Sequence, residues 1–249
     1  MRNPRRWWFF YFKRLSYYLF GLRLAALFSG GKDSTYAIYL MERRGHHVEH
    51  LLTILPESDE SLYFHYPNIE LTKLQAKAMM KHQLVERCGI GKDEELSALA
   101  RLIERVLGMV DGVVSGAIAS RFQLKAFKEI CEKYNLSLFA PLWGMNPLTI
   151  LWKMINEGFE IIITGVAAAG LGKELLGARL TPSLVKEIQK VSDKFGIHPA
   201  GEGGEFETFV LDAPIFKQRI EITEAEADWR GDRGFLKIKG AKLVRKKNY

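Results

Sequence analysis

The residues best suited to chemistry lie in a short glycine loop, Ser-Gly-Gly-Lys-Asp-Ser at positions 29–34. Glycines let a backbone approach a phosphate closely, and the free N–H groups at the start of a helix point at such an anion. Ser29 and Ser34 can add hydroxyl donors, and Lys32 supplies a positive charge. Asp33 offers the oxygen ligands that Mg²⁺ prefers, and its charge also suits a helix N-terminus. The loop therefore predicts a site for the phosphates of a nucleotide.

This loop is not a Walker A motif, although it contains Gly-Gly-Lys. The motif G-x-x-x-x-G-K-[ST] would need glycine at position 26 and serine or threonine at position 33, where the chain has Ala26 and Asp33. The hydroxyl that binds Mg²⁺ in such loops is missing, so transfer of the γ-phosphate is disfavoured. A plain turn before a capped helix is the structural alternative. The apolar run ahead of the loop and its two serines argue against that alternative.

A second group of candidate residues lies at 201–207, where three glutamates and three glycines share seven positions. The carboxylates of Glu202, Glu205 and Glu207 could bind a cation or an ammonium group, or take a proton from an attacking amine. The alternative is a polar turn with solvated carboxylates, and composition alone favours it.

Strands and helices must hold these two groups in place. An apolar run at 24–28 leads into the loop, and a helical pattern at 33–44 with a glycine stop follows it. The same alternation continues to residue 140. Further strands are expected at 48–54, 83–86, 112–118 and 136–140, and helices at 71–80, at 94–107 and after the N-cap Ser120. This alternation predicts an α/β fold with a parallel sheet, helices on both faces and ligands at the carboxyl ends of its strands.

The pattern changes character past Trp143. Helices are expected after Asn146 and Thr181, a strand at 159–166, a glycine-rich loop at 170–177, and strands through the last fifty residues. We therefore expect a domain at 22–144 that carries the phosphate loop. A smaller α+β substrate-binding domain at 145–249 follows it, and a basic, aromatic extension at 1–21 precedes both.

Most of the net charge of +7 comes from the extension. Six basic and no acidic residues fall in the first 23 positions, which leaves 30 basic and 29 acidic residues in the rest of the chain. The near-neutral body disfavours a nucleic-acid partner, despite a basic cluster at 237–247. The extension is interrupted by Lys13-Arg14 and lacks a cleavage site, so neither a membrane span nor a signal peptide is expected. An over-extended gene model, an arm that packs on a partner subunit and an interfacial membrane helix all stay open.

The cysteines and histidines offer little chemistry of their own. Cys88 and Cys131 lie far apart and form no C-x-x-C, so no disulfide or thiolate metal site is expected, and a reducing, cytoplasmic setting follows. The histidines at 46–50 follow the helix stop at Gly45, which predicts a solvated turn rather than a zinc site. His198 reads as isolated.

The loop at 29–34 resembles the PP-loop of the ATP pyrophosphatase superfamily, which includes GMP synthetase, asparagine synthetase, tRNA lysidine synthetase and tRNA thiolases. The resemblance implies a HUP-type, Rossmann-like sheet. It also implies an enzyme that releases pyrophosphate and leaves AMP on an acceptor oxygen, from which a nucleophile displaces it.

Residues 202–212 resemble the signature of one branch of that superfamily, the diphthine-ammonia ligases, as do 116–120 with Gln123, 141–143 and 165–180. The likeness covers nearly everything between residues 24 and 214. It implies ATP-dependent amidation of diphthine, a modified histidine of translation elongation factor 2, by ammonium. An acyl-adenylate would form on the way, and the products would be diphthamide, AMP and pyrophosphate.

The resemblance also implies a set of site residues. ATP would bind along the loop with Mg²⁺ held by Asp33, Thr53 would lie near adenine, and the glutamates would face diphthine. The residues implied for nucleotide binding are Phe28, Ser29, Gly30, Gly31, Lys32, Asp33, Ser34, Thr53, Gly116, Ala117 and Ser120. Those implied for catalysis are Lys32, Asp33, Glu202, Glu205 and Glu207.

Other members of the superfamily fit less well. A thiolase would need paired cysteines, a lysidine synthetase a more basic body, and an amidotransferase a glutaminase domain with an N-terminal cysteine, so free ammonium is the simpler nitrogen source. Another PP-loop ligase acting on tRNA or a small carboxylate stays open, as does a protein that binds adenine nucleotides without turnover. Release of pyrophosphate separates the last of these from the enzymes. Assembly into a homo-oligomer is also left open.

Overall fold

The computed structural model describes residues 21–56, 68–89 and 91–246. The extension predicted at 1–21 lies, apart from Gly21, outside these residues. Among the described helices, none has the length and apolarity needed to cross a membrane.

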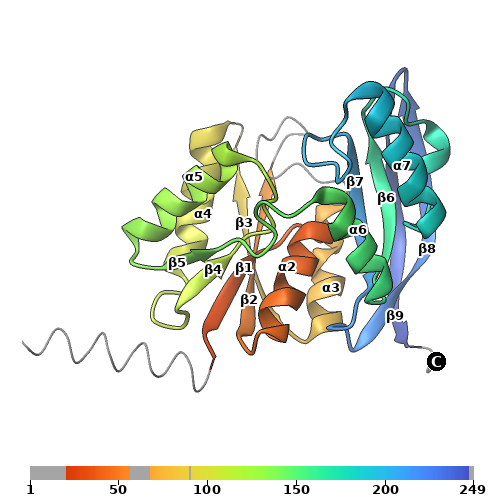
Figure 1. Ribbon diagram of the computed structural model, residues 1–249. Helices are drawn as coiled ribbons and strands as arrows, with labels where there is room; N and C mark the ends of the chain where they lie inside the picture. The colour runs from red at the N-terminus through yellow and green to blue at the C-terminus, as the bar shows by residue number, and fades with distance from the viewer. Residues whose placement is uncertain (1–20, 57–67, 90, 247–249) are drawn as a thin grey trace, which may run out of the picture.

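The first half of the chain builds a five-stranded parallel sheet in the order β3-β2-β1-β4-β5. Its elements are β1 (Arg23–Leu27), α2 (Lys32–Arg43), β2 (His47–Pro56), η1 (Ile69–Leu71), α3 (Thr72–Met79), β3 (His82–Cys88), α4 (Lys92–Glu104), β4 (Gly112–Val114), α5 (Arg121–Lys133) and β5 (Ser137–Phe139). Figure 1 shows α2 and α3 on one face of this sheet and α4 and α5 on the other. The predicted Rossmann-like α/β fold is confirmed.

Strand β1 is buried from Leu24 to Leu27 because helices cover both faces of the sheet. The chain steps from β1 out to β3 on one side, then returns to place β4 and β5 on the other side of β1. The strand order therefore reverses between β1 and β4. In open parallel sheets, ligands bind in the crevice at the carboxyl ends of the two strands that flank such a reversal.

Strand β4 is shorter than the sequence pattern indicates. It was expected to run from 112 to 118, but it ends at Val114. Ser115 N still donates to Phe139 O at 2.8 Å, but the chain then leaves the sheet, and the backbone N–H groups of 118–120 donate to the carboxylate of Glu202. The apolar pattern alone could not reveal that distant partner.

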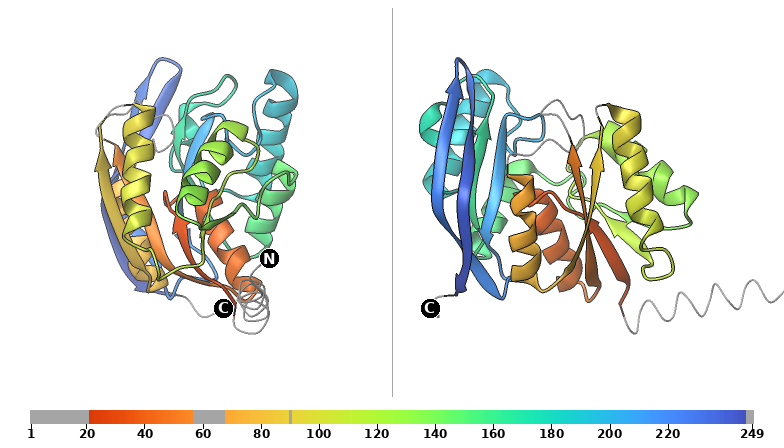
Figure 2. Two further views of the ribbon diagram at one scale, coloured as in Figure 1. Left: turned by 90° about the vertical axis from the view of Figure 1, so that its left-hand side faces the viewer. Right: turned by 180° about the vertical axis from the view of Figure 1, so that it is seen from behind.

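The second half of the chain builds a four-stranded antiparallel sheet in the order β7-β6-β9-β8. Its elements are α6 (Pro147–Asn156), β6 (Glu160–Val166), η2 (Lys173–Leu175), α7 (Pro182–Phe195), β7 (Phe206–Asp212), β8 (Gln218–Arg230) and β9 (Arg233–Arg245). Asn146 and Thr181 cap α6 and α7 as predicted, their side-chain oxygens accepting from Thr149 N at 3.0 Å and Leu184 N at 3.3 Å. Strands β8 and β9 are longer than the strands that the sequence pattern indicates at 216–222 and 235–238, and they form one extended hairpin, seen edge-on in Figure 2.

The two sheets share one hydrophobic core. Helices α2 and α3 lie between them, as both figures show, and the buried cluster on these helices continues into β6, β7 and α6. Tyr36 of α2, for example, meets Phe159 edge to face with ring centroids 5.4 Å apart. A second, smaller cluster lies under α4 and α5. The predicted boundary near residue 144 falls between β5 and α6, and the division into domains there stays a prediction because the core is continuous across it.

Candidate active site

The glycine loop at 29–34, called the phosphate loop from here on, joins β1 to α2 at the point where the strand order reverses. Gly30 has a φ of +80°, which favours glycine, and its carbonyl oxygen accepts from Val210 N at 3.1 Å and Gln75 Nε2 at 2.8 Å. The hydroxyls of Ser29 and Ser34 lie 3.1 Å apart at the centre of the loop. The loop is thus bound on one side by β7 of the second sheet and by α3.

Lys32 is the cation of the loop, and its side chain is only 3% exposed. Its Nζ donates to Asp33 Oδ2 at 2.8 Å and lies 5.2 Å from the centre of the Phe206 ring. Its backbone N–H donates to Thr208 Oγ1 at 3.1 Å. A buried ammonium is costly unless it is paired, so the pairing with Asp33 keeps a positive charge at the phosphate loop.

Asp33 uses only one of its carboxylate oxygens. Oδ1 is buried and has no hydrogen-bond partner, while Oδ2 accepts from Lys32. Burial raises the pKa of Asp33, and the nearby Lys32 ammonium offsets part of that rise. An unpaired buried carboxylate oxygen fits a cation such as Mg²⁺, which is bound in nucleotide sites by one or two carboxylates, water and phosphate oxygens. In the part of the chain that the structure describes, no three His, Cys, Asp or Glu residues gather as a larger metal site.

The loop after β4 packs directly against the phosphate loop. A Cβ at Gly116 would lie 2.7 Å from Ser34 N, so only glycine allows this approach. Ser120 caps α5 as predicted, and its Oγ accepts from Gln123 N at 3.4 Å. The residues between them present their N–H groups at the carboxyl end of β4.

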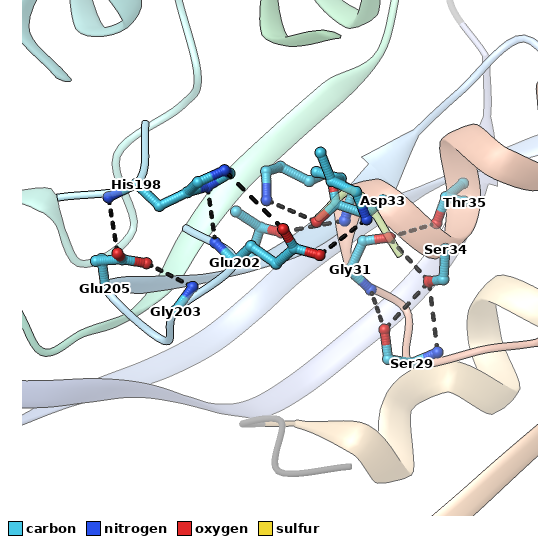
Figure 3. Close-up of polar contacts among 12 residues, drawn as sticks. Ser29, Gly31, Asp33, Ser34, Thr35, His198, Glu202, Gly203 and Glu205 are labelled. Atoms are coloured by element: carbon cyan, nitrogen blue, oxygen red, sulfur yellow. Dashed lines mark hydrogen bonds and ion pairs between the residues drawn. The ribbon is translucent and has the colours of Figure 1, made fainter. Parts of the chain in front are cut away.

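Glu202 connects the second half of the chain to that loop. Its Oε1 accepts three backbone hydrogen bonds, from Ile118 and Ala119 at 2.8 Å and from Ser120 at 3.0 Å. Its own N–H donates to His198 Nδ1 at 3.3 Å. Figure 3 shows Glu202 between His198 and the phosphate loop. The sequence suggested that His198 is isolated. It instead accepts a hydrogen bond from the backbone of Glu202 and helps to hold that residue in place.

We expect Glu202→Ala to lower the melting temperature by about 10 °C or more, because three N–H groups lose a charged acceptor. Hydrogen bonds to a charged group contribute about 1.5–3 kcal/mol each, and 1 kcal/mol corresponds to about 2–4 °C in a domain of this size. Thermal unfolding followed by circular dichroism measures the change. Glu49→Ala, at an exposed position of β2, is the control and should melt close to the wild type. Equal melting of all three proteins would contradict the anchoring role of Glu202.

The other two glutamates of the motif differ from Glu202. Glu205 Oε1 accepts from His198 N at 2.7 Å and its Oε2 accepts from Gly203 N at 2.8 Å, so both oxygens hold the turn. Glu205 also lies farther from the phosphate loop in Figure 3. Glu207 lies on β7 and faces the loop, where burial raises its pKa to about 8 despite the opposing effect of Lys32.

A cleft of about 810 Å³, including the space open to solvent, lies between these groups. Both halves of the chain line it. The residues that line it are Leu27, Phe28, Ser29, Gly31, Lys32, Asp33, Ser34, Ser115, Gly116, Ala117, Ile118, Gln123, Phe127, Gly201, Glu202, Phe206, Glu207 and Thr208. Among these lining residues Lys32 carries the only positive charge.

Four of the predicted site residues do not line the cleft: Gly30, Thr53, Ser120 and Glu205. Thr53 was expected near adenine, but it is fully buried, and its Oγ1 donates to Phe28 O at 2.9 Å and accepts from Gln83 Nε2. It therefore supports the backbone that enters the loop. The prediction missed Phe206 as the ring beneath Lys32 and Thr208 as an acceptor for the loop, although both fall inside or next to the glutamate motif.

Sequence models of the diphthamide synthase N-terminal and C-terminal domains match residues 22–138 and 146–244. The chain belongs to the diphthamide synthase family. The resemblance seen in the sequence is thereby confirmed, and with it membership of a family of carbon-nitrogen ligases. The two matched regions meet at the cleft, since one contributes the phosphate loop and the other the glutamate motif.

Two relatives in the diphthamide synthase family are similar to this chain over most of their length. A diphthine–ammonia ligase of Rattus norvegicus is 33% identical over 227 residues, which cover 83% of this chain and 85% of the relative. The enzyme of the same name from Bos taurus is 32% identical over 226 residues, covering 82% and 84%. A crystal structure titled as a predicted subunit of tRNA methyltransferase from Methanocaldococcus jannaschii is 16% identical, covers 77% of this chain and 98% of that chain, and has a TM-score of 0.43.

Proposed function

We propose that this protein catalyses the ATP-dependent amidation of diphthine on translation elongation factor 2 by ammonium, through an acyl-adenylate. The products are diphthamide, AMP and pyrophosphate. The observation that carries the proposal is the shared cleft, in which the phosphate loop of the first sheet faces the glutamate motif at 201–207, which runs into the start of β7. Membership of the diphthamide synthase family and the names of its relatives support the choice of substrate.

The first step activates the carboxylate of diphthine. One of its oxygens attacks the α-phosphorus of ATP, and the bond from that phosphorus to the oxygen bridging to the β-phosphate breaks. Pyrophosphate leaves, and AMP stays on the carboxylate oxygen. The Lys32 ammonium and the N–H groups that follow Lys32 at the start of α2 bind the β- and γ-phosphates and stabilise the charge that builds up as they depart. Asp33 would hold Mg²⁺ through its unpaired Oδ1, and that ion neutralises phosphate charge when bound.

The second step forms the amide. The lone pair of ammonia attacks the activated carbon, and the bond to the AMP oxygen breaks. Ammonium must first lose a proton, and the attacking nitrogen loses another after the bond forms. Glu207 is the group we assign to accept a proton, because it faces the cleft and its pKa of about 8 suits a base at mildly alkaline pH, where its carboxyl is ionised. Glu205 then holds the turn that presents Glu202 and Glu207 rather than touching the substrate.

Three further assignments accompany the proposal. The segment 22–144 binds ATP, and the segment 145–249 binds the protein substrate. The partner is the modified translation factor and not a nucleic acid. The reaction takes place in the cytoplasm, where translation occurs.

The products of the nucleotide test the proposal directly. Incubation of the full chain with Mg-ATP, ammonium and elongation factor 2 carrying diphthine should yield AMP and pyrophosphate in step with amidation of the factor. Chromatography of the nucleotides and mass spectrometry of the factor measure the two. Leaving out ammonium should stop amide formation, and leaving out the factor should stop AMP release.

Two results would contradict it. If ADP and phosphate appear in place of AMP, cleavage does not occur between the α- and β-phosphates. If ATP binds without any turnover, the protein is the non-catalytic nucleotide binder that the sequence left open.

A further inference from the structure

Gln75 is a fully buried amide on α3 that no sequence pattern singled out. Its Nε2 donates to Gly30 O at 2.8 Å and to Val210 O at 2.9 Å. The N–H of Val210 donates to the same Gly30 oxygen at 3.1 Å. One carbonyl of the phosphate loop is thus held by a helix of the first half and a strand of the second.

These bonds fix the orientation of the loop. A carbonyl oxygen carries a partial negative charge, so a Gly30 carbonyl turned toward a phosphate would repel it. Held by Gln75 and Val210, the oxygen stays against α3 and β7. Gly30 also lies so close that a Cβ there would be 2.2 Å from Gln75 Oε1, which leaves the loop little freedom to shift toward α3.

The side-chain amide of Gln75 is suited to orienting the Gly30 carbonyl, whereas a residue that only filled the core would be better apolar. Its Oε1 is buried without a hydrogen-bond partner, which is unfavourable in a protein interior. Its two donated bonds go to the loop and to the strand beside the loop. The contacts of Gln75 therefore point to the conformation of the loop rather than to general filling of the core.

We propose that Gln75 is a positioning residue for the phosphate loop, which it holds in the conformation that receives the β- and γ-phosphates. The inference rests on the proposed function in that it takes the loop to be the site of the ATP phosphates. Gln75 itself touches no substrate and acts through Gly30.

The test compares the affinities of ligands that carry the β- and γ-phosphates, which would reach the phosphate loop, with the affinity of AMP, which would not. Gln75→Met keeps the length of the side chain and removes both donors. We expect it to weaken binding of inorganic pyrophosphate and of α,β-methylene-ATP by about tenfold or more, a change of about 1.4 kcal/mol or more. Binding of AMP, which lacks the two outer phosphates, should change by less than about twofold. Isothermal titration calorimetry with the full chain measures all three.

The matched control is Asn68→Gly. Asn68 also holds backbone through its side-chain amide, since Nδ2 donates to Leu236 O at 2.9 Å and Oδ1 accepts from Ile238 N at 2.7 Å, and it is not among the residues that line the cleft. Glycine suits the φ of +68° at this position, so loss of the amide should lower the melting temperature but leave the affinities for pyrophosphate, the ATP analogue and AMP near those of the wild type.

The proposal is overturned if Gln75→Met binds pyrophosphate as the wild type does, or if its affinities for pyrophosphate and AMP fall together. It is also overturned if Asn68→Gly loses pyrophosphate binding to the same extent. Should Gln75→Met not fold, Gln75→Asn keeps the amide but shortens its reach by one methylene, and the same outcomes decide. A wild-type protein that binds none of the three ligands would instead contradict the proposed function itself.

Discussion

Replacing Lys32 by methionine is expected to lower the rate of ATP-dependent amidation by about 10²–10³-fold, the usual loss when one preorganised donor to a developing charge is removed. Lys32 carries the only positive charge among the residues that line the cleft, and it is buried against Phe206, where water screens its charge little. Methionine keeps most of the side-chain volume. Release of AMP under saturating ATP and ammonium measures the effect.

A second buried lysine provides the control for this substitution. Lys81 is 10% exposed and pairs with the carboxylate of Glu42 and the carbonyl of Val48; Glu42 lies at the C-terminal end of α2, whereas the phosphate loop lies at its N-terminal end. Lys81→Met should cost stability but leave the rate of amidation within about twofold of the wild type, since it removes no charge from the site. If Lys32→Met keeps the wild-type rate while folded, the assignment of the loop to the ATP phosphates is wrong.

The second large effect concerns stability and pH. The pKa of Glu207 is about 8 in the folded chain, against an ordinary value of 4.5. Between these values an unfolded chain has this carboxyl ionised while the folded chain keeps it protonated, so folding takes up a proton. The free energy of unfolding of the ligand-free protein should therefore fall as pH rises from about 5 to 8, by at most about 1.4 kcal/mol per pH unit from this group.

Glu207→Gln removes this dependence, because an amide does not titrate. We expect the variant to gain on the wild type steadily as pH rises through that range and to keep its advantage above pH 8. Urea unfolding at several pH values measures the difference between the two proteins. The difference isolates Glu207 from Asp33, whose pKa is also raised, and from His46 and His50, whose lowered pKa values act in the opposite direction. Parallel curves for the two proteins would contradict the assignment.

Local signals made the first sheet predictable. The apolar run of β1, the glycines after it and the basic last turn of α2 each follow from rules that involve only neighbouring residues. The N-caps Ser120, Asn146 and Thr181 were predicted for the same reason, since a cap bonds an N–H group only three residues away. Most elements therefore appear close to where the pattern put them.

The details of the site depended on partners far away in the chain. The chain after β4 bonds Glu202, more than 80 residues later, and the buried hydroxyl of Thr53 bonds Gln83 and Phe28. Spacing also could not assign the three glutamates, because Glu202 and Glu205 lie in a turn whereas Glu207 lies on a strand. Three glutamates close together in the sequence thus have three different roles. Glu202 accepts hydrogen bonds from the loop after β4, Glu205 holds the turn, and Glu207 is a buried acid.

The continuous core between the two sheets limits how a protein substrate can reach the phosphates. Rotating one half away from the other would expose Tyr36, Phe159 and their neighbours to water, and every 100 Å² of apolar surface so exposed costs about 2.5 kcal/mol. A cleft of fixed width is therefore favoured in free energy over one that opens by rotation of the two halves. For the diphthine substrate proposed above, the modified histidine side chain therefore has to reach into the cleft without such a rotation.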